Sequence, residues 1–156
     1  MHEYQATISW KRDDNGSAPH RYGREHTWTF DGGLTVPASA SPQLVRAPYS
    51  NAAAIDPEEA FVAALSSCHM LWFLDLAARR GYRVTNYVDR AVGVMEKSKA
   101  GKVAITRVRL RPEATFAGEK LPTTEEINAL HHAAHEECFI ANSVTTEVRC
   151  EPIYAT

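Results

Sequence analysis

The strongest hydropathy pattern in the chain runs from Asp56 to Gly81, where nearly every face of a helix would be apolar. Asp56 suits an N-cap, Pro57 the first helical position and Gly81 the position just past the C-terminus. A helix that is apolar all round cannot keep one side in water. We therefore expect a long central helix that is buried on all sides.

This helix is interpreted as a core helix because its apolar run is short. Only about 15 residues, Ala60 to Leu74, precede the charged Asp75, whereas a bilayer needs roughly 20. The pattern predicts no membrane span.

Alternating apolar and polar residues predict strands before the helix. Tyr4, Ala6, Ile8 and Trp10 alternate with polar residues, which indicates a strand with one buried face. Residues 12–25 are interpreted as a loop, because Asp, Asn, Gly and Pro interrupt the alternation. A hairpin is expected over residues 28–36 around Asp31-Gly32-Gly33, followed by an irregular connector from 37 to 56.

The second half predicts more strands and one further helix. Strands are expected from 83 to 97 and from 102 to 112, joined by a turn at 98–101, and a last strand covers 146–150. Between them, Thr123 and Glu126 have the spacing of a capping box. Ile127, Leu130, Ala134 and Cys138 would share one stripe of the helix that follows.

The order of these elements predicts an α+β fold with antiparallel sheets, because strands and helices do not alternate regularly. We expect residues 1–156 to form a single domain. One domain of this size has too few other elements to cover an apolar helix on every side. Burial against a second copy would provide the cover, so an obligate homodimer is expected.

Charge and composition exclude several classes of function. The chain has 17 basic and 19 acidic residues, a net charge of −2 and no long run of like charge. This balance argues against nucleic acid or an anionic membrane as a partner. The N-terminus lacks the pattern of a secretory signal, so we expect a cytoplasmic protein.

Three cysteines are the candidate chemical groups. Their odd number and wide spacing, at 68, 138 and 150, do not fit a disulfide scaffold. Cys68 and Cys138 fall on the inward stripes of the two expected helices, so they are placed to meet and to cycle with a disulfide. Each would also pass as a small core residue. Cys150, facing inward on the last strand, is expected to be inert.

Asp56-Pro57-Glu58-Glu59, followed by Leu65-Ser66-Ser67-Cys68 and by a second cysteine at Cys138, resembles the superfamily of osmotically inducible protein C and organic hydroperoxide resistance proteins (OsmC/Ohr). The resemblance covers essentially the whole chain. It implies an OsmC-like fold and an intertwined homodimer. It also implies a thiol peroxidase without a cofactor, which reduces organic hydroperoxides and is reduced in turn by an external dithiol.

The resemblance also implies residue roles. Cys68 would attack the O–O bond and become a sulfenic acid, and Cys138 would resolve it to a disulfide. A cation is needed to favour the thiolate, and the superfamily takes it from an arginine held by a glutamate. Glu58 matches the glutamate. Arg24 is the favoured arginine, with Arg21 as the other candidate.

Glu58 and Cys68 lie ten residues apart, roughly 15 Å along a straight helix and on different faces. They cannot meet within one regular helix. Either the first turn is unwound, or Glu58 serves the cysteine of the partner subunit.

Two sequence departures leave alternatives open. His69 follows Cys68, and Phe139 follows Cys138 where better-known members carry proline. One alternative is a catalytically divergent protein that binds a small apolar ligand. The other is a metal protein, in which His131, His135 and Cys138, at helical spacings of four and seven, would hold zinc. A metal there would occupy Cys138 and exclude its resolving role.

Overall fold

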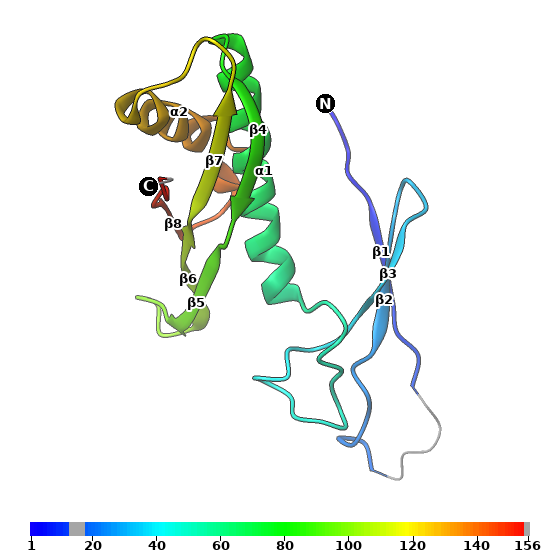
Figure 1. Ribbon diagram of the computed structural model, residues 1–156. Helices are drawn as coiled ribbons and strands as arrows, with labels where there is room; N and C mark the ends of the chain where they lie inside the picture. The colour runs from blue at the N-terminus through cyan, green and yellow to red at the C-terminus, as the bar shows by residue number, and fades with distance from the viewer. Residues whose placement is uncertain (13–17, 155–156) are drawn as a thin grey trace. The chain divides into compact units, whose positions relative to one another are not determined.

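The structure is a computed structural model that describes residues 1–12 and 18–154. It divides into two compact units, Met1–Ala60 and Phe61–Thr156, each of which is described by itself. Figure 1 labels the elements along the chain. The expectation of a single domain stays a prediction.

The first unit contains a three-stranded antiparallel sheet in the order β1-β2-β3. The strands are β1 (Ala6–Ser9), β2 (His26–Phe30) and β3 (Thr35–Ala38). Trp28 lies opposite Val36, and Gly33 has a φ of 86° in the turn, so the predicted hairpin is confirmed. In the loop expected at 12–25, residues 13–17 lie outside the described residues, and the remainder contains no strand.

The long helix α1 (Pro57–Arg79) begins and ends as the capping residues predict. The backbone N–H of Glu59 donates to Asp56 Oδ1 at 2.7 Å, and the Glu59 carboxylate accepts from the Asp56 N–H at 3.4 Å. Gly81, with a φ of 79°, takes the left-handed conformation that ends the helix at little steric cost. The helix is therefore continuous through its first turn.

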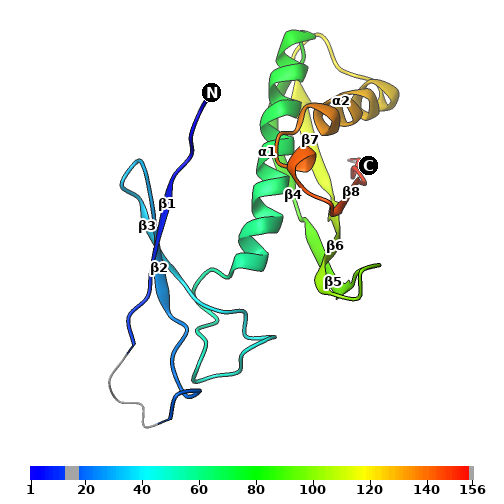
Figure 2. The same ribbon diagram turned by 180° about the vertical axis from the view of Figure 1, so that it is seen from behind.

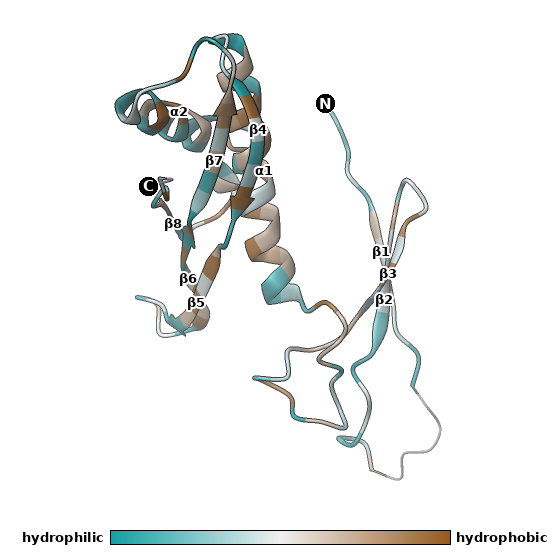
Figure 3. Ribbon diagram, in the orientation of Figure 1, coloured by the Kyte–Doolittle hydropathy of each residue, from teal (hydrophilic) through white to brown (hydrophobic). Residues whose placement is uncertain are grey.

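Within one chain, α1 is buried along one stripe and not all round. Leu65, His69, Phe73 and Ala77 form this stripe at a spacing of four residues, whereas Leu71 is 60% exposed. Figure 3 shows the helix tan to brown over most of its length. By length and composition alone α1 could cross a membrane, a test that the core helix of a soluble protein also passes. The described residues of the second unit alone therefore do not give α1 the expected complete cover.

The second unit has two sheets. The strands β4 (Arg83–Asp89) and β7 (Pro112–Ala117) pair with each other, and β5 (Val92–Lys97), β6 (Val103–Leu110) and β8 (Glu147–Cys150) form the other sheet in the order β5-β6-β8. The expectation of one strand over 83–97 is therefore wrong, because its two halves belong to different sheets. The side chain of Asp89 marks the break: it accepts hydrogen bonds from Ser66 Oγ at 2.5 Å and from the Arg111 N–H at 2.6 Å.

Strand pairing is antiparallel except between β6 and β8, which run parallel. The α+β class holds, and the expectation of purely antiparallel sheets is corrected at this pair. β8 reaches β6 after α2 and a 3-10 turn, η1 (Ala141–Ser143), which bring the chain back in the same direction.

The second helix, α2 (Thr124–Glu137), begins with the predicted capping box between Thr123 and Glu126. Its buried residues Leu130 and Ala134 pack with Phe73 and Ala77 of α1. Figure 2, from the opposite side to Figure 1, shows α2 beside α1 and α1 beside β4 and β7. This packing carries Cys138, the residue that caps α2, towards the middle of α1.

Candidate functional site

The structure brings Cys68 and Cys138 together in the second unit. Cys68 lies on α1 next to the buried stripe and is half-buried, whereas Cys138 is only 1% exposed at the end of α2. The two thiols are close enough that Cys68 raises the pKa of the Cys138 thiol. The Ala141 N–H also points at the Cys138 sulfur, at 3.4 Å.

The environment keeps Cys138 protonated at neutral pH. Burial is the largest cause that raises the pKa of its thiol to about 11, and the hydrogen bond and charge of Cys68 raise it further. A thiol with a raised pKa is a hydrogen-bond donor and a poor nucleophile. The more exposed Cys68 is therefore the sulfur that an incoming molecule can reach.

Cys68 opens onto an apolar pocket of ≈ 540 Å³. Leu71, Trp72, Phe139 and Ile140 line it, and Trp72 meets Phe139 edge to face with ring centroids 5.4 Å apart. Asp75 and Arg79, an ion pair at 2.8 Å, also line the pocket. The pocket can accept a molecule with an apolar body and expose it to the Cys68 sulfur.

Glu58 lies in the first unit, in the first turn of α1. Its Oε2 is buried and has no hydrogen-bond partner among the described residues. Because α1 is helical from Pro57 onward, the alternative of an unwound first turn is wrong. Ten helical residues still separate Glu58 from Cys68 in one chain, roughly 15 Å of rise.

Arg24 also lies in the first unit, directly before β2. Its guanidinium lies 3.8 Å from the ring centroid of Tyr22 and donates to the Tyr22 carbonyl. Its backbone N–H donates to the Tyr49 carbonyl at 2.9 Å. The other candidate, Arg21, lies in a turn in which its backbone N–H donates to the Ala18 carbonyl. The activating role of either arginine stays a prediction.

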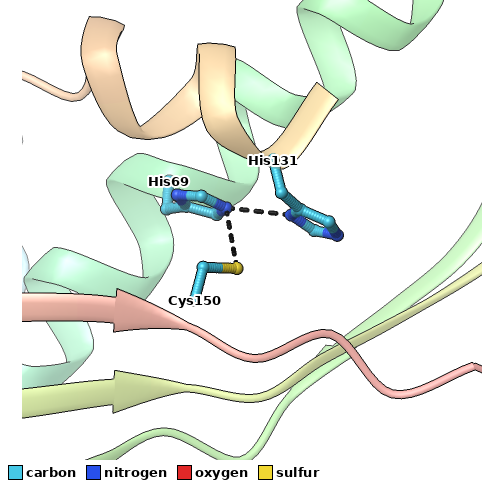
Figure 4. A group of neighbouring side chains, drawn as sticks. All are labelled: His69, His131 and Cys150. Atoms are coloured by element: carbon cyan, nitrogen blue, oxygen red, sulfur yellow. Dashed lines mark hydrogen bonds between the residues drawn. The ribbon is translucent and has the colours of Figure 1, made fainter. Parts of the chain in front are cut away.

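A second cluster, which sequence reasoning missed, consists of His69, Cys150 and His131. Figure 4 shows these side chains pointing at one another from α1, β8 and α2. His69 Nε2 lies 3.0 Å from His131 Nδ1 and 3.6 Å from Cys150 Sγ. The available signal was His69 itself, which falls four residues after Leu65 and four before Phe73 on the buried stripe.

This cluster corrects the ligand set of the metal alternative. Among the described residues, the donors that gather within 4.8 Å of one another are His69, His131 and Cys150, not His131, His135 and Cys138. The reason is the end of α2: Cys138 caps the helix and turns to Cys68, while His131 points to β8. The expected competition for Cys138 between a metal and a disulfide therefore disappears.

Burial keeps both histidines of the cluster neutral. It lowers the pKa of His69 to about 4, with a smaller contribution from His135, and lowers the pKa of His131 to about 3, with a smaller contribution from His69. The pKa of the Cys150 thiol is raised by burial and then by the charges of Asp89 and Glu151, to about 12. At neutral pH the cluster holds two neutral imidazoles and a thiol.

The family model described as "OsmC-like protein" matches residues 50–152. The chain belongs to the OsmC-like family.

Solved structures agree with this assignment. An OsmC-like protein of unknown function from Vibrio cholerae is 52% identical, with a TM-score of 0.96 over 98% of this chain and 100% of that one. An organic hydroperoxide resistance protein OsmC from Legionella pneumophila is 16% identical, with a TM-score of 0.71 over 100% of this chain and 98% of that one.

The organic hydroperoxide resistance protein of Bacillus subtilis is 18% identical, with a TM-score of 0.64 over 99% and 98% of the two chains. At these lower identities the likeness concerns the fold alone. A search of curated proteins gave no match.

Proposed function

We propose that this protein is a thiol-dependent peroxidase that reduces organic hydroperoxides to alcohols. The observation that carries the proposal is the pairing of two unlike thiols: Cys68 opens onto an apolar pocket, and the buried Cys138 is close enough for Cys68 to raise its pKa. The names of the Legionella and Bacillus proteins support the substrate class.

The proposed reaction has two steps in the protein. The Cys68 thiolate attacks the distal oxygen of ROOH; the O–O bond breaks, RO⁻ takes a proton and leaves as ROH, and Cys68 becomes a sulfenic acid. Cys138 then attacks the Cys68 sulfur, and the sulfenic oxygen leaves as water with the Cys138 proton. The resulting disulfide is reduced by an external dithiol, which supplies both electrons.

The pocket favours a bulky organic substrate over hydrogen peroxide. Leu71, Trp72, Phe139 and Ile140 offer an alkyl or fatty-acid tail an apolar surface, whereas hydrogen peroxide gains nothing from it. The contact between Cys68 and Cys138 serves the second step, because a nearby thiol intercepts the sulfenic acid before further oxidation.

A second copy of the chain completes the proposal. The exposed side of α1, which includes Leu71, leaves apolar surface that an intertwined homodimer would cover. In such a dimer Glu58 of the partner subunit, holding Arg24 or Arg21, would bring a cation to Cys68. This arrangement agrees with a buried Glu58 oxygen that has no partner within the described part of one chain. A reducing cytoplasm would supply the dithiol.

Turnover of cumene hydroperoxide with dithiothreitol as reductant tests this function. The wild type should consume peroxide catalytically. Cys68→Ser should abolish turnover. In the absence of dithiothreitol, Cys138→Ser should consume one equivalent of peroxide and accumulate a sulfenic acid that dimedone traps. If the wild type binds but does not consume the peroxide, the protein is a binding module and the peroxidase proposal is wrong.

A further inference from the structure

We propose that His69, His131 and Cys150 form a binding site for a transition-metal ion of the zinc type, separate from the paired thiols. The three donors come from three elements, α1, α2 and β8, so the site depends on the fold and not on a local motif. Imidazole nitrogen and thiolate sulfur are the ligands that zinc prefers.

Two of the three donor spacings are close to those around one metal ion, and all the donor atoms lie within 4.8 Å of one another. With Zn–N of about 2.0 Å and Zn–S of about 2.3 Å, tetrahedral angles place two nitrogens roughly 3.4 Å apart and a nitrogen and sulfur roughly 3.6 Å apart. The His69–His131 nitrogens are 3.0 Å apart, and His69 Nε2 to Cys150 Sγ is 3.6 Å. The two imidazoles need to part by only a few tenths of an ångström.

The protonation chemistry also permits metal binding. The His69 and His131 rings are nearly parallel, with an interplanar angle of 9°. His69 Nδ1 is buried and has no hydrogen-bond partner in the described part of the chain, so no acceptor fixes the tautomer. His69 can therefore carry its proton on Nδ1 and free Nε2 for a metal. The Cys150 thiol would lose its proton, so one proton is released for each ion bound.

The cluster has an entrance from solvent. An open cavity of ≈ 200 Å³ is lined by His131 and Cys150 together with Asn128 and His135. A metal ion can enter through it, and a water molecule can occupy the fourth coordination position. Because neither Cys68 nor Cys138 belongs to the cluster, a metal there leaves the paired thiols free.

Zinc titration of the full-length, chelator-stripped protein against a chromophoric competitor tests the site. We expect one ion per chain. Cys150→Ser and His131→Gln should each weaken binding by more than the roughly 10–100-fold that outer-shell changes cost. The matched controls Cys68→Ser and Cys138→Ser should retain wild-type affinity, and circular dichroism should verify that every variant is folded.

Cobalt(II) provides a second readout that does not depend on affinity. In the wild type it should give a thiolate-to-metal charge-transfer band, and Cys150→Ser should lose this band while Cys138→Ser keeps it. The proposal is overturned if no stoichiometric ion binds, if Cys150→Ser retains the band, or if Cys138→Ser abolishes binding. None of these readouts depends on peroxidase activity, so the two proposals fail separately.

Discussion

Cys68 and Cys138 differ in access and in proton affinity, although they are the same residue type in contact. Cys68 borders an open pocket, and Cys138 is buried with its pKa raised to about 11. This difference supports the proposed roles, in which Cys68 attacks the hydroperoxide and Cys138 resolves the sulfenic acid. The sequence could place both on inward helix faces, but it contained no information on which of them solvent reaches.

The difference in solvent access and pKa between Cys68 and Cys138 predicts that the two thiols of the reduced protein are alkylated at different rates. Iodoacetamide should modify Cys68 before Cys138, because Cys138 is buried and mostly protonated at pH 7–8. The rate at Cys138 should rise about tenfold for each pH unit below about 11, as its thiolate fraction does. Peptide mass spectrometry across pH 7 to 10 measures both rates. A Cys138 rate that levels off below pH 9 would contradict the raised pKa.

The proposed role of Glu58 predicts a catalytic effect without loss of the helix cap. Glu58→Gln should lower kcat/KM for cumene hydroperoxide about tenfold or more, which corresponds to about 1.4 kcal/mol of lost transition-state stabilisation. Glu59→Gln is the matched control: it lies in the same helical turn, keeps an oxygen for the Asp56 N–H and should retain activity. Equal losses in both variants would indicate a general effect on the helix start.

Among the helices and strands, α1 packs closely against β5. A Cβ added to Gly93 on β5 would lie 2.6 Å from Val62 Cγ2 on α1, far inside van der Waals contact. Only glycine therefore fits between this strand and the helix without displacement. The contact fixes how near the sheet approaches the helix that carries Cys68.

Gly93→Ala should lower the free energy of unfolding by about 1–3 kcal/mol, the usual cost of overpacking. Chemical denaturation measures the change. Gly32→Ala is the matched control, because nothing lies within 4 Å of its added Cβ, and it should change stability much less. An unchanged midpoint for Gly93→Ala would show that the helix and strand can separate freely.

Helices could be predicted from sequence better than the sheets. The starts of α1 and α2 are encoded locally, by Asp56 with Glu59 and by Thr123 with Glu126, and the structure confirms both. The break between β4 and β5 depends on Asp89, whose partners Ser66 and Arg111 are each more than 20 residues away in the sequence. Such long-range hydrogen bonds leave no periodic signal.

The candidate sites also differ in how far local sequence could predict them. Cys68 and Cys138 could be paired because each falls on an apolar helix stripe. The cluster of His69, His131 and Cys150 requires α1, α2 and β8 to meet, and the parallel pairing of β8 with β6 was not predicted. Helical spacing alone therefore grouped His131 with His135 and Cys138, whereas its neighbours in the fold are His69 and Cys150.

For the whole molecule, the uncovered side of α1 predicts a homodimer. Sedimentation velocity at micromolar concentration should give twice the chain mass of 17.3 kDa. Leu71→Asp, which places a charge on this side, should shift the protein toward monomer. Leu121→Asp, at a leucine with the same 60% exposure ahead of α2, is the control and should leave the mass unchanged. A monomeric wild type would contradict this assembly.

The proposed function requires Cys68 and Cys138 to form a catalytic redox pair. The most direct measurement is peptide mass spectrometry of the reduced protein after one equivalent of cumene hydroperoxide, with free thiols alkylated before digestion. Two thiols per chain should disappear, the Cys68 and Cys138 peptides should become joined by a disulfide, and Cys150 should stay reduced. Full retention of both thiols under excess hydroperoxide, or a disulfide that involves Cys150, would contradict the proposed function.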